Sequence, residues 1–359
     1  MKYLNILEIC KKLLLHLIVF VCFHSWILKI IRFFSGHFHV KNNIDSKLRF
    51  TFINIRKSRN FQILTYHRVN DENDSFLPAM CTKVFSEQMR YIASNFNVLS
   101  LEDIIERMKK KDIPDNAIVI TFDDGYKDNY LNVFPILKEL SIPATIFLAT
   151  EAIGSQKILW HDRVFSAFRE TQVEHFDGFG INNQIYSLTT QEEKNCARSD
   201  ILKFLKNVNN EERILYIDRL MNKLDINDKK EEANLMMTWE EVKKMHGNGI
   251  FFGAHTFTHT ILSNLNIKKA EEEIFSSKKI IEEKLGTEVR TFAYPNGSKT
   301  DFNETTKNLL REAGYSCAVT TMFGTNSMDQ DCFELRRGMP WEEDIRTFGL
   351  KLHYYKFCS

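Results

Sequence analysis

Short apolar runs alternate with helical patterns along most of the chain after residue 60. The runs are rich in Ile, Val, Phe and Thr, which is typical of parallel strands that are buried on both faces. On this pattern we predict strands at residues 61–66, 117–122, 142–149, 249–254, 289–294, 315–320 and 333–336.

Apolar residues at helical spacing fill the segments between these runs. They predict helices at residues 86–96, 101–111, 128–140, 268–285 and 303–313. Gly286 and Gly314 directly follow the last two, where a helix commonly ends in the left-handed conformation that glycine adopts easily. Alternation of strands and helices predicts a parallel α/β fold, and we favour a barrel over an open sheet.

Residues 160–235 break this alternation with a polar, helix-rich segment. Candidate helices lie at 162–170, 197–205 and 211–224. We interpret the segment as an insertion over one end of the barrel. It could be a surface cap or a substrate lid, and the sequence leaves both open.

The first sixty residues have a different character. Residues 13–28 contain no Asp, Glu, Lys or Arg, and as a helix they would reach about 24 Å, short of the ~30 Å hydrocarbon core of a bilayer. Ser25, Lys29 and Arg32 then line one helical face and apolar residues cover the rest. This pattern favours an apolar, amphipathic helix at a membrane, with a buried core helix as the alternative.

Charge is distributed unevenly between this segment and the rest. Residues 1–60 hold 11 Lys and Arg against 2 Asp and Glu, whereas the remainder holds 37 against 45. The basic segment suits an anionic membrane surface. The whole-chain net charge of +1 disfavours a nucleic-acid partner, and seven cysteines without a C-x-x-C pair disfavour both a disulfide framework and a cysteine zinc site.

The chain therefore divides into a membrane-associating segment (1–59), a barrel (60–345) and a C-terminal tail (346–359). A cleaved signal peptide is disfavoured, because no A-x-A-like site follows the apolar stretch. If that stretch spans the bilayer, the excess of Lys and Arg after it favours the cytoplasmic face for the barrel. The periplasmic or extracellular face stays open.

The first candidate for chemistry is T-F-D-D-G at residues 121–125. Asp123 and Asp124 follow directly after a predicted strand, and in parallel α/β folds catalytic side chains project from the carboxyl ends of strands. Adjacent carboxylates repel each other unless they share a cation, so one could bind a metal while the other acts as a base. An Asp-Gly turn that caps the next helix is the alternative.

Two histidines form the second candidate. His255 and His259 follow the strand predicted at 249–254, at a spacing that lets both imidazoles converge. Imidazoles together with a carboxylate suit zinc and similar divalent metals. A pair of hydrogen-bonded polar histidines is the alternative reading.

The third candidate is R-T-F-A-Y-P-N-G at residues 290–297. Arg290 could hold a carboxylate, and a backbone N–H of the turn at Tyr294 could stabilise an oxyanion. Plain turn chemistry is the alternative.

Together, T-F-D-D-G, H-T-x-x-H and R-x-F-A-Y-P, in this order, resemble the polysaccharide deacetylases, the NodB-homology group of carbohydrate esterases. These enzymes remove N- or O-acetyl groups from sugars. The resemblance covers roughly residues 60–345, apart from part of 160–235. It implies a distorted (β/α) barrel, here of about seven parallel strands, with a metal at its mouth.

The resemblance also implies a role for each matching residue. It makes Asp124, His255 and His259 the metal ligands and Asp123 the general base. Arg290 would orient Asp123, and the Tyr294 backbone N–H would contribute to the oxyanion hole. A divalent metal with three protein ligands, zinc above all, has room for water and a substrate carbonyl, which suits hydrolysis of an amide.

The general acid has two candidates. Leu350 to His353 loosely matches the L-x-x-H motif that many relatives carry late in the chain. Other relatives have a permuted layout with a Tyr-His pair on the first strand, which Tyr66 and His67 match. We favour His67 and keep His353 as the alternative. Four further residues are candidates for lining the sugar cleft, namely Trp160, Asp162, Arg336 and Trp341.

We therefore expect a metal-dependent hydrolase that removes N-acetyl groups from amino sugars of a glycan or glycolipid. Two alternatives stay open: an amidohydrolase acting on a non-sugar amide, and a catalytically silent glycan-binding domain. The complete set of aspartates, histidines and arginine counts against the silent domain.

Overall fold

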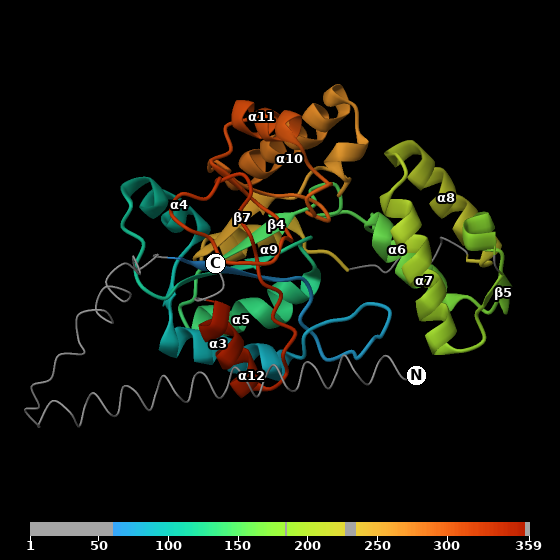
Figure 1. The fold of residues 1–359 in the computed structure, drawn as a ribbon, viewed down its shortest axis with the longest axis horizontal. Coiled ribbons are helices and arrows are strands. Elements are labelled where there is room, and N and C mark those ends of the chain that lie inside the picture. The colour runs from blue at the N-terminus through green and yellow to red at the C-terminus, as the bar shows by residue number, and fades with distance from the viewer. Residues whose placement is uncertain (1–59, 184, 227–234, 356–359) are drawn as a thin grey trace, which may run out of the picture. The chain divides into compact units, whose positions relative to one another are not determined.

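The computed structural model describes residues 60–183, 185–226 and 235–355 (Figure 1). Its centre is a parallel sheet in the order β1-β3-β4-β7-β8-β9, and a short β2 also pairs with β3. The strands are β1 (Gln62–Tyr66), β2 (Asn97–Val98), β3 (Ala117–Phe122), β4 (Ala144–Leu148), β7 (Ile250–Ala254), β8 (Thr291–Ala293) and β9 (Cys317–Val319).

Residues 335–338 link the two edges of this sheet. Leu335 forms a parallel bridge to Val319 of β9, and Gly338 forms one to Leu64 of β1. The Gly338 N–H donates to the Ile63 carbonyl at 2.8 Å. The expected distorted (β/α) barrel is thereby confirmed. The strand predicted at 333–336 occurs as these isolated bridges rather than as a regular strand.

Both faces of the strands are buried. All six residues of β3 are buried, and its five apolar residues divide between two hydrophobic clusters on opposite faces. Val119 joins the cluster inside the barrel, which α4 closes with Ile104 and Met108. Ile120 joins the cluster beneath the outer helices. Replacing Val119 or Ile120 with alanine would lower the free energy of unfolding by about 2–5 kcal/mol, because the packed neighbours cannot move to fill the cavity that is left.

The outer helices mostly begin and end near their predicted positions. They are α3 (Thr82–Asn95), α4 (Leu101–Lys110), η1 (Asn129–Val133) leading into α5 (Phe134–Glu139), α9 (Trp239–His246), α10 (Ile267–Leu285), α11 (Glu304–Glu312) and α12 (Ile345–Tyr355). Local chemistry sets several ends: the Ser100 hydroxyl accepts from the Asp103 N–H, and Gly286 is left-handed at φ 69°. Helix α9 was not predicted from the sequence.

The C-terminal segment differs from its prediction as a tail. Helix α12 packs against the barrel, with Phe348 and Leu352 buried. The Gln62 side chain at the start of β1 donates to the Leu352 carbonyl at 3.0 Å. Apolar residues at helical spacing therefore fix this segment to the amino end of β1.

The predicted insertion is a helical bundle with its own core (Figure 1). Its elements are α6 (Trp160–Glu170), β5 (His175–Phe176), η2 (Gly178–Asn183), β6 (Tyr186–Ser187), α7 (Gln191–Lys206) and α8 (Asn210–Lys223). Phe168, Ile201 and Leu220 are buried between the three helices. Because the bundle has its own hydrophobic core, it is a small structural unit and not a loop.

The membrane-associating segment predicted at 1–59 lies outside the described residues and stays a prediction. Within the described ranges, no helix combines the length and the apolar character that crossing a bilayer requires.

Candidate active site

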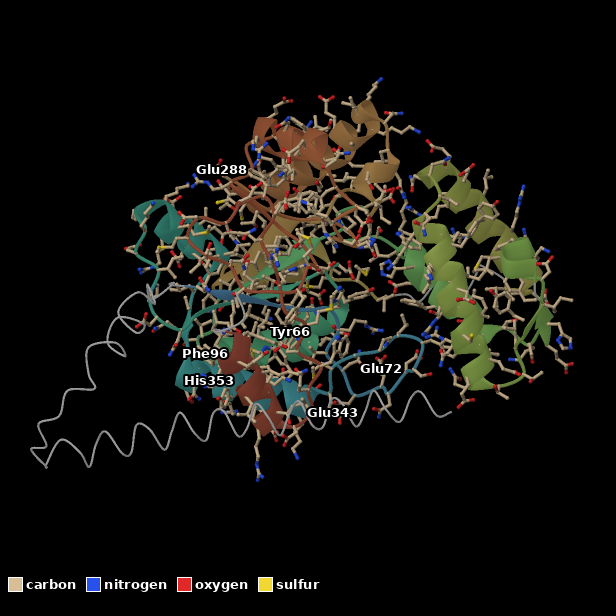
Figure 2. The ribbon with its side chains drawn as sticks, in the orientation of Figure 1. Tyr66, Glu72, Phe96, Glu288, Glu343 and His353 are labelled. Atoms are coloured by element: carbon tan, nitrogen blue, oxygen red, sulfur yellow. The ribbon has the colours of Figure 1, made fainter. Side chains whose placement is uncertain are left out.

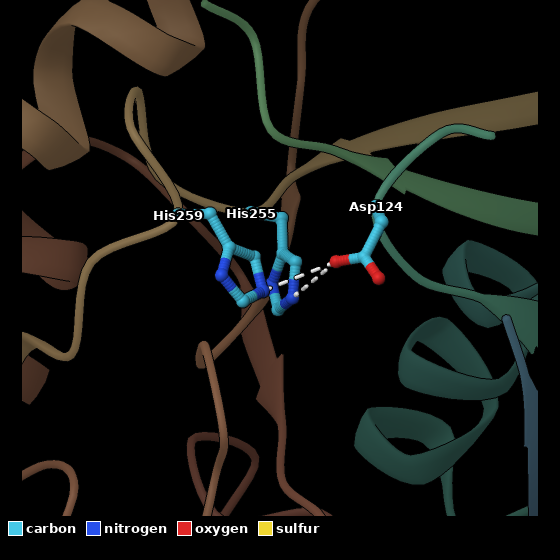
Figure 3. Close-up of side chains that lie close together, drawn as sticks. All are labelled: Asp124, His255 and His259. Atoms are coloured by element: carbon cyan, nitrogen blue, oxygen red, sulfur yellow. Dashed lines mark ion pairs between the residues drawn. The ribbon is translucent and has the colours of Figure 1, made fainter. Parts of the chain in front are cut away.

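The two aspartates and the two histidines meet at the carboxyl ends of neighbouring strands. Asp123 and Asp124 follow β3, His255 follows β7, and β4 lies between these strands. Figure 3 shows the Asp124 carboxylate directed at both imidazoles. Asp124 Oδ1 lies 3.1 Å from His259 Nε2 and 3.5 Å from His255 Nε2. The three side chains are buried and offer ligand atoms within 4.8 Å of one another.

The polar atoms at this point fit a cation. His255 Nδ1 lies 2.7 Å from the Ala293 carbonyl, so Nδ1 carries the proton and the Nε2 lone pair faces Asp124. Asp124 Oδ1 and His259 Nδ1 are buried without a hydrogen-bond partner. Burial lowers the pKa of His255 to about 4, which keeps its imidazole neutral. A positive ion between the Asp124 carboxylate and the lone pair of His255 Nε2 would satisfy both acceptors, and two imidazoles with a carboxylate suit a divalent metal.

The second aspartate is held by an arginine. Arg337 donates from Nη1 to Asp123 Oδ1 at 2.8 Å and from Nη2 to Oδ2 at 2.7 Å, and both side chains are almost completely buried. Burial would raise the pKa of Asp123, but the charge and hydrogen bonds of Arg337 outweigh it and the pKa is lowered. Asp123 is thus an ionised carboxylate of fixed orientation beside the candidate metal centre.

A cleft of about 430 Å³ opens over these groups. The barrel contributes His67, Asp123, Asp124, His255 and His259 to its lining, and the helical insertion contributes Trp160, His161, Asp162 and Lys206. Trp341 and Met339 line it from the segment that precedes α12, and both are exposed. Apolar and aromatic surface around a small number of convergent polar groups is typical of a small-molecule or sugar site.

Comparison with known proteins agrees with this arrangement. The sequence profile described as polysaccharide deacetylase matches residues 110–318. The chain belongs to the polysaccharide deacetylase family. It is accordingly a hydrolase, and the aspartates and histidines of the first two motifs lie together at the mouth of its barrel.

Two relatives and one solved structure illustrate the family likeness. The YxkH protein of Bacillus subtilis (strain 168), whose name places it among polysaccharide deacetylases, is 23% identical over 288 residues, which are 80% of this chain and 73% of YxkH. The poly-beta-1,6-N-acetyl-D-glucosamine N-deacetylase of Staphylococcus aureus (strain MSSA476) is 24% identical over 202 residues, which are 50% of this chain and 67% of that protein. IcaB from Ammonifex degensii shares the fold, with a TM-score of 0.54 and 17% identity over 83% of this chain and 97% of IcaB.

The prediction that Arg290 orients the deacetylase's Asp123 is wrong. Arg290 is half-exposed and pairs with Glu288 at 2.7 Å, and Figure 2 shows Glu288 at the periphery of the domain. The physical reason is the position of Arg290 in the chain, directly before β8 begins at Thr291. It therefore lies at the amino end of a strand, whereas the active site of a parallel barrel lies at the carboxyl ends.

Arg337 makes the contact with the Asp123 carboxylate that was predicted for Arg290. The neighbouring Arg336 was predicted to line the sugar cleft, but that prediction is wrong, because Arg336 is exposed and does not line it. In the extended segment 335–338, side chains alternate between two faces, so Arg337 shares the buried face of Leu335 and Arg336 points the opposite way. Because Arg337 lies two residues after the apolar Leu335, this alternation could have indicated from the sequence that Arg337 faces inward.

Replacing Arg337 with methionine should move the acid limb of the enzyme's pH–rate profile to higher pH. Without the guanidinium, burial raises the pKa of Asp123, so a smaller fraction of the carboxylate is ionised at neutral pH. We expect activity at pH 7 to fall by about tenfold or more, with partial recovery at higher pH. The pH–rate profile of the deacetylation reaction measures this.

Arg290→Met is the matched control and should keep the wild-type profile. Breaking a buried ion pair also destabilises a fold, by about 3–5 kcal/mol, so thermal unfolding of both variants must be followed. An Arg337→Met enzyme with an unchanged profile would show that Arg337 does not hold Asp123 ionised.

The Tyr294 backbone N–H is also not placed as predicted. It donates to the Val319 carbonyl at 3.2 Å as part of the pairing between β8 and β9. The Tyr294 hydroxyl donates to the Phe333 carbonyl, and the Tyr294 ring stacks on Phe302. Tyr294 is therefore a buried core residue, and in this structure its N–H is not available to an oxyanion.

The two candidates for the general acid lie in different places. His67 lines the cleft, with Nε2 at 3.8 Å from Asp123 Oδ2 and its side chain 38% exposed. His353 is exposed on α12 and stacks on Phe96, beside which Figure 2 shows it. Phe96 directly precedes β2, which pairs with the start of β3, so His353 lies near the amino edge of the sheet.

Two polar residues of the cleft were not singled out from the sequence. The Tyr126 hydroxyl donates to Asp162 at 3.0 Å and lies 3.1 Å from His161 Nε2. The His161 ring packs against His259, with the ring centroids 4.7 Å apart. Asp162 is fully buried, so its carboxylate holds Tyr126 and helix α6 in place. The sequence offered one indication that His161 lies in the cleft, namely that it directly follows Trp160.

Proposed function

We propose that this deacetylase removes N-acetyl groups from amino sugars of a glycan or glycolipid, with the help of a divalent metal, zinc above all. The observation that carries the proposal is the buried set of Asp124, His255 and His259 beside a second carboxylate that an arginine holds ionised. Hydrolysis of an amide requires an activated water, a base and an acid at one place, and the cleft brings suitable groups together.

Each residue then has a definite task. Asp124, His255 and His259 would hold the metal, which when bound lowers the pKa of a water molecule and polarises the acetyl carbonyl. Asp123 accepts the proton of the attacking water, and Arg337 keeps it oriented while it does so. The water oxygen becomes the second oxygen of the released acetate, and the sugar nitrogen leaves as an amine.

The sugar nitrogen needs a proton to leave, and we propose that His67 supplies it. The side chain is partly exposed in the cleft and lies close to Asp123. A histidine side chain in this position can donate a proton to the nitrogen as the C–N bond breaks. Trp341 and Met339, exposed at the edge of the cleft, offer an apolar surface to the sugar ring.

Replacing His67 with alanine should lower kcat by about 100-fold while metal content stays intact, which is the usual contribution of a general acid. The loss should shrink for an activated acetate ester, because its leaving group departs without a proton. His353→Ala is the control and should be nearly neutral. The reverse pattern, an essential His353 and a dispensable His67, would return the general acid to the C-terminal motif.

The substrate class draws support from one relative. The Staphylococcus aureus protein is named for acting on poly-beta-1,6-N-acetyl-D-glucosamine. We propose an N-acetylated amino sugar for this chain as well. Full-length enzyme should release acetate from such a glycan and leave a free amine on it, and a chelator should stop the reaction.

The same assay separates the alternatives. Release of amine only from non-sugar amides would favour an amidohydrolase. Retention of the glycan on the protein without acetate release, with metal present, would favour a silent glycan-binding domain. Either result would contradict the proposed function.

A further inference from the structure

The loop that joins the two histidines has an unusual backbone. Thr256 and His259 adopt left-handed conformations, with φ of 63° and 57°. L-residues with a Cβ seldom do so, and they remain there only where the surrounding structure holds them. The ligand atoms of His259 are therefore placed by whatever holds this loop.

Helix α10 holds one side of the loop. The Glu273 carboxylate accepts the N–H groups of Phe257 and Thr258, each at 2.8 Å, and the Thr258 hydroxyl at 2.6 Å. Within the loop, the Thr260 N–H donates to the Thr256 hydroxyl at 3.2 Å. These bonds hold residues 256–258 and 260, but none of them involves His259 itself.

The helical insertion holds His259. The Trp160 indole, at the start of α6, donates from Nε1 to the His259 carbonyl at 3.1 Å. This bond fixes the peptide that follows His259, and with it the direction in which the imidazole leaves the backbone. Trp160 had been expected only to line the sugar cleft, and it does line it.

Arg213 of α8 holds Trp160 in turn. Its guanidinium lies over the Trp160 ring, 4.8 Å from the ring centroid, and donates to the carbonyls of Leu205 at 2.9 Å and Val208 at 3.3 Å. Arg213 is 1% exposed, and Nη1 also lies 3.5 Å from the Thr260 hydroxyl.

No carboxylate within the described ranges pairs with Arg213, and burial lowers its pKa to about 10. A buried cation without a counter-ion is costly to a fold. The contacts of Arg213 with backbone carbonyls and with the indole ring join α8, the end of α7, Trp160 and the histidine loop at one point.

We propose that Trp160 and Arg213 are positioning residues for the metal centre, through which the helical insertion fixes His259 in its ligand conformation. The insertion is then a fixed wall of the active site and not a lid that opens over it. The inference rests on the proposed function in one respect, because it assumes that His259 binds the metal.

The test compares zinc affinity among variants of the full-length chain, measured by competition with a chromophoric chelator. Trp160→Phe removes the indole donor and keeps an aromatic ring, and we expect zinc to bind about tenfold more weakly. Arg213→Lys, which loses the planar contact with the indole, should weaken binding in the same direction. In both variants the Co²⁺ absorption spectrum should change, because the ligand field at the metal changes.

Tyr216→Leu is the matched control. Tyr216 packs against Phe179 and Phe204 inside the insertion, so its loss should lower the thermal stability of the bundle without weakening zinc binding. Zinc affinity that is unchanged in Trp160→Phe, or reduced equally in Tyr216→Leu, would overturn the inference.

Hydrogen exchange in the metal-free protein gives a readout that does not depend on metal binding. The Thr260 amide should exchange faster in Trp160→Phe than in wild type or in Tyr216→Leu, and equal rates would overturn the inference. A wild-type protein that binds no zinc would instead contradict the proposed function, and the exchange comparison would still decide the role of Trp160.

Discussion

Alanine in place of His255 or His259 is expected to abolish both metal binding and deacetylase activity. Each substitution removes one of the three buried side chains that we propose as ligands, and two protein ligands are too few to hold a divalent metal tightly. Metal-ligand free energies are large, so we expect loss of stoichiometric metal rather than a graded decrease.

Metal content of the purified variants, measured by elemental analysis beside an activity assay, checks this expectation. His175→Ala is the matched control, because His175 is an exposed histidine on β5 of the insertion. It should keep both metal and activity. A His255→Ala or His259→Ala variant that retains stoichiometric metal would refute the ligand assignment.

Asparagine in place of Asp123 is expected to leave the metal bound and to lower activity by about 100-fold or more, the usual contribution of a general base. The amide has nearly the shape of the carboxylate but cannot accept a proton from water. Asp124→Asn should behave differently and lose the metal, because Asp124 faces both imidazoles and Asp123 faces Arg337.

Steady-state kinetics and metal analysis of the two variants separate these roles. Asp123→Asn also leaves the buried guanidinium of Arg337 without its counter-ion, so its thermal stability should fall and its fold must be verified. Asp218→Asn, at an exposed position of α8, provides the control. Loss of metal from Asp123→Asn with retention by Asp124→Asn would mean that the two roles are reversed.

Local composition was sufficient to predict much of the barrel. The strand predicted at 117–122 coincides with β3, because a run of β-branched and aromatic residues without a charged residue is typical of a strand buried on both faces. Gly286 ends α10 as predicted, because the left-handed cap depends on one residue and glycine adopts that conformation easily. Helix α9 was missed although Thr238 and Glu241 form a capping box at its start, because its eight residues are too few to show a helical apolar repeat clearly.

The sequence by itself also determined the centre of the site. Asp123, Asp124, His255 and His259 each follow an apolar strand, and the carboxyl ends of parallel strands share one edge, so their convergence follows from chain order alone. The same rule supports the preference for His67, which follows β1, and it could have excluded Arg290, which precedes its strand.

Only the tertiary structure decided which residues support that centre. Arg337 reaches Asp123 across 214 positions of the chain, and Trp160 reaches His259 across 99. No local pattern encodes either pairing, because both depend on how the barrel closes and how the insertion packs onto it. The order of strands and loops brings the candidate ligands together, whereas contacts between distant elements set their orientation.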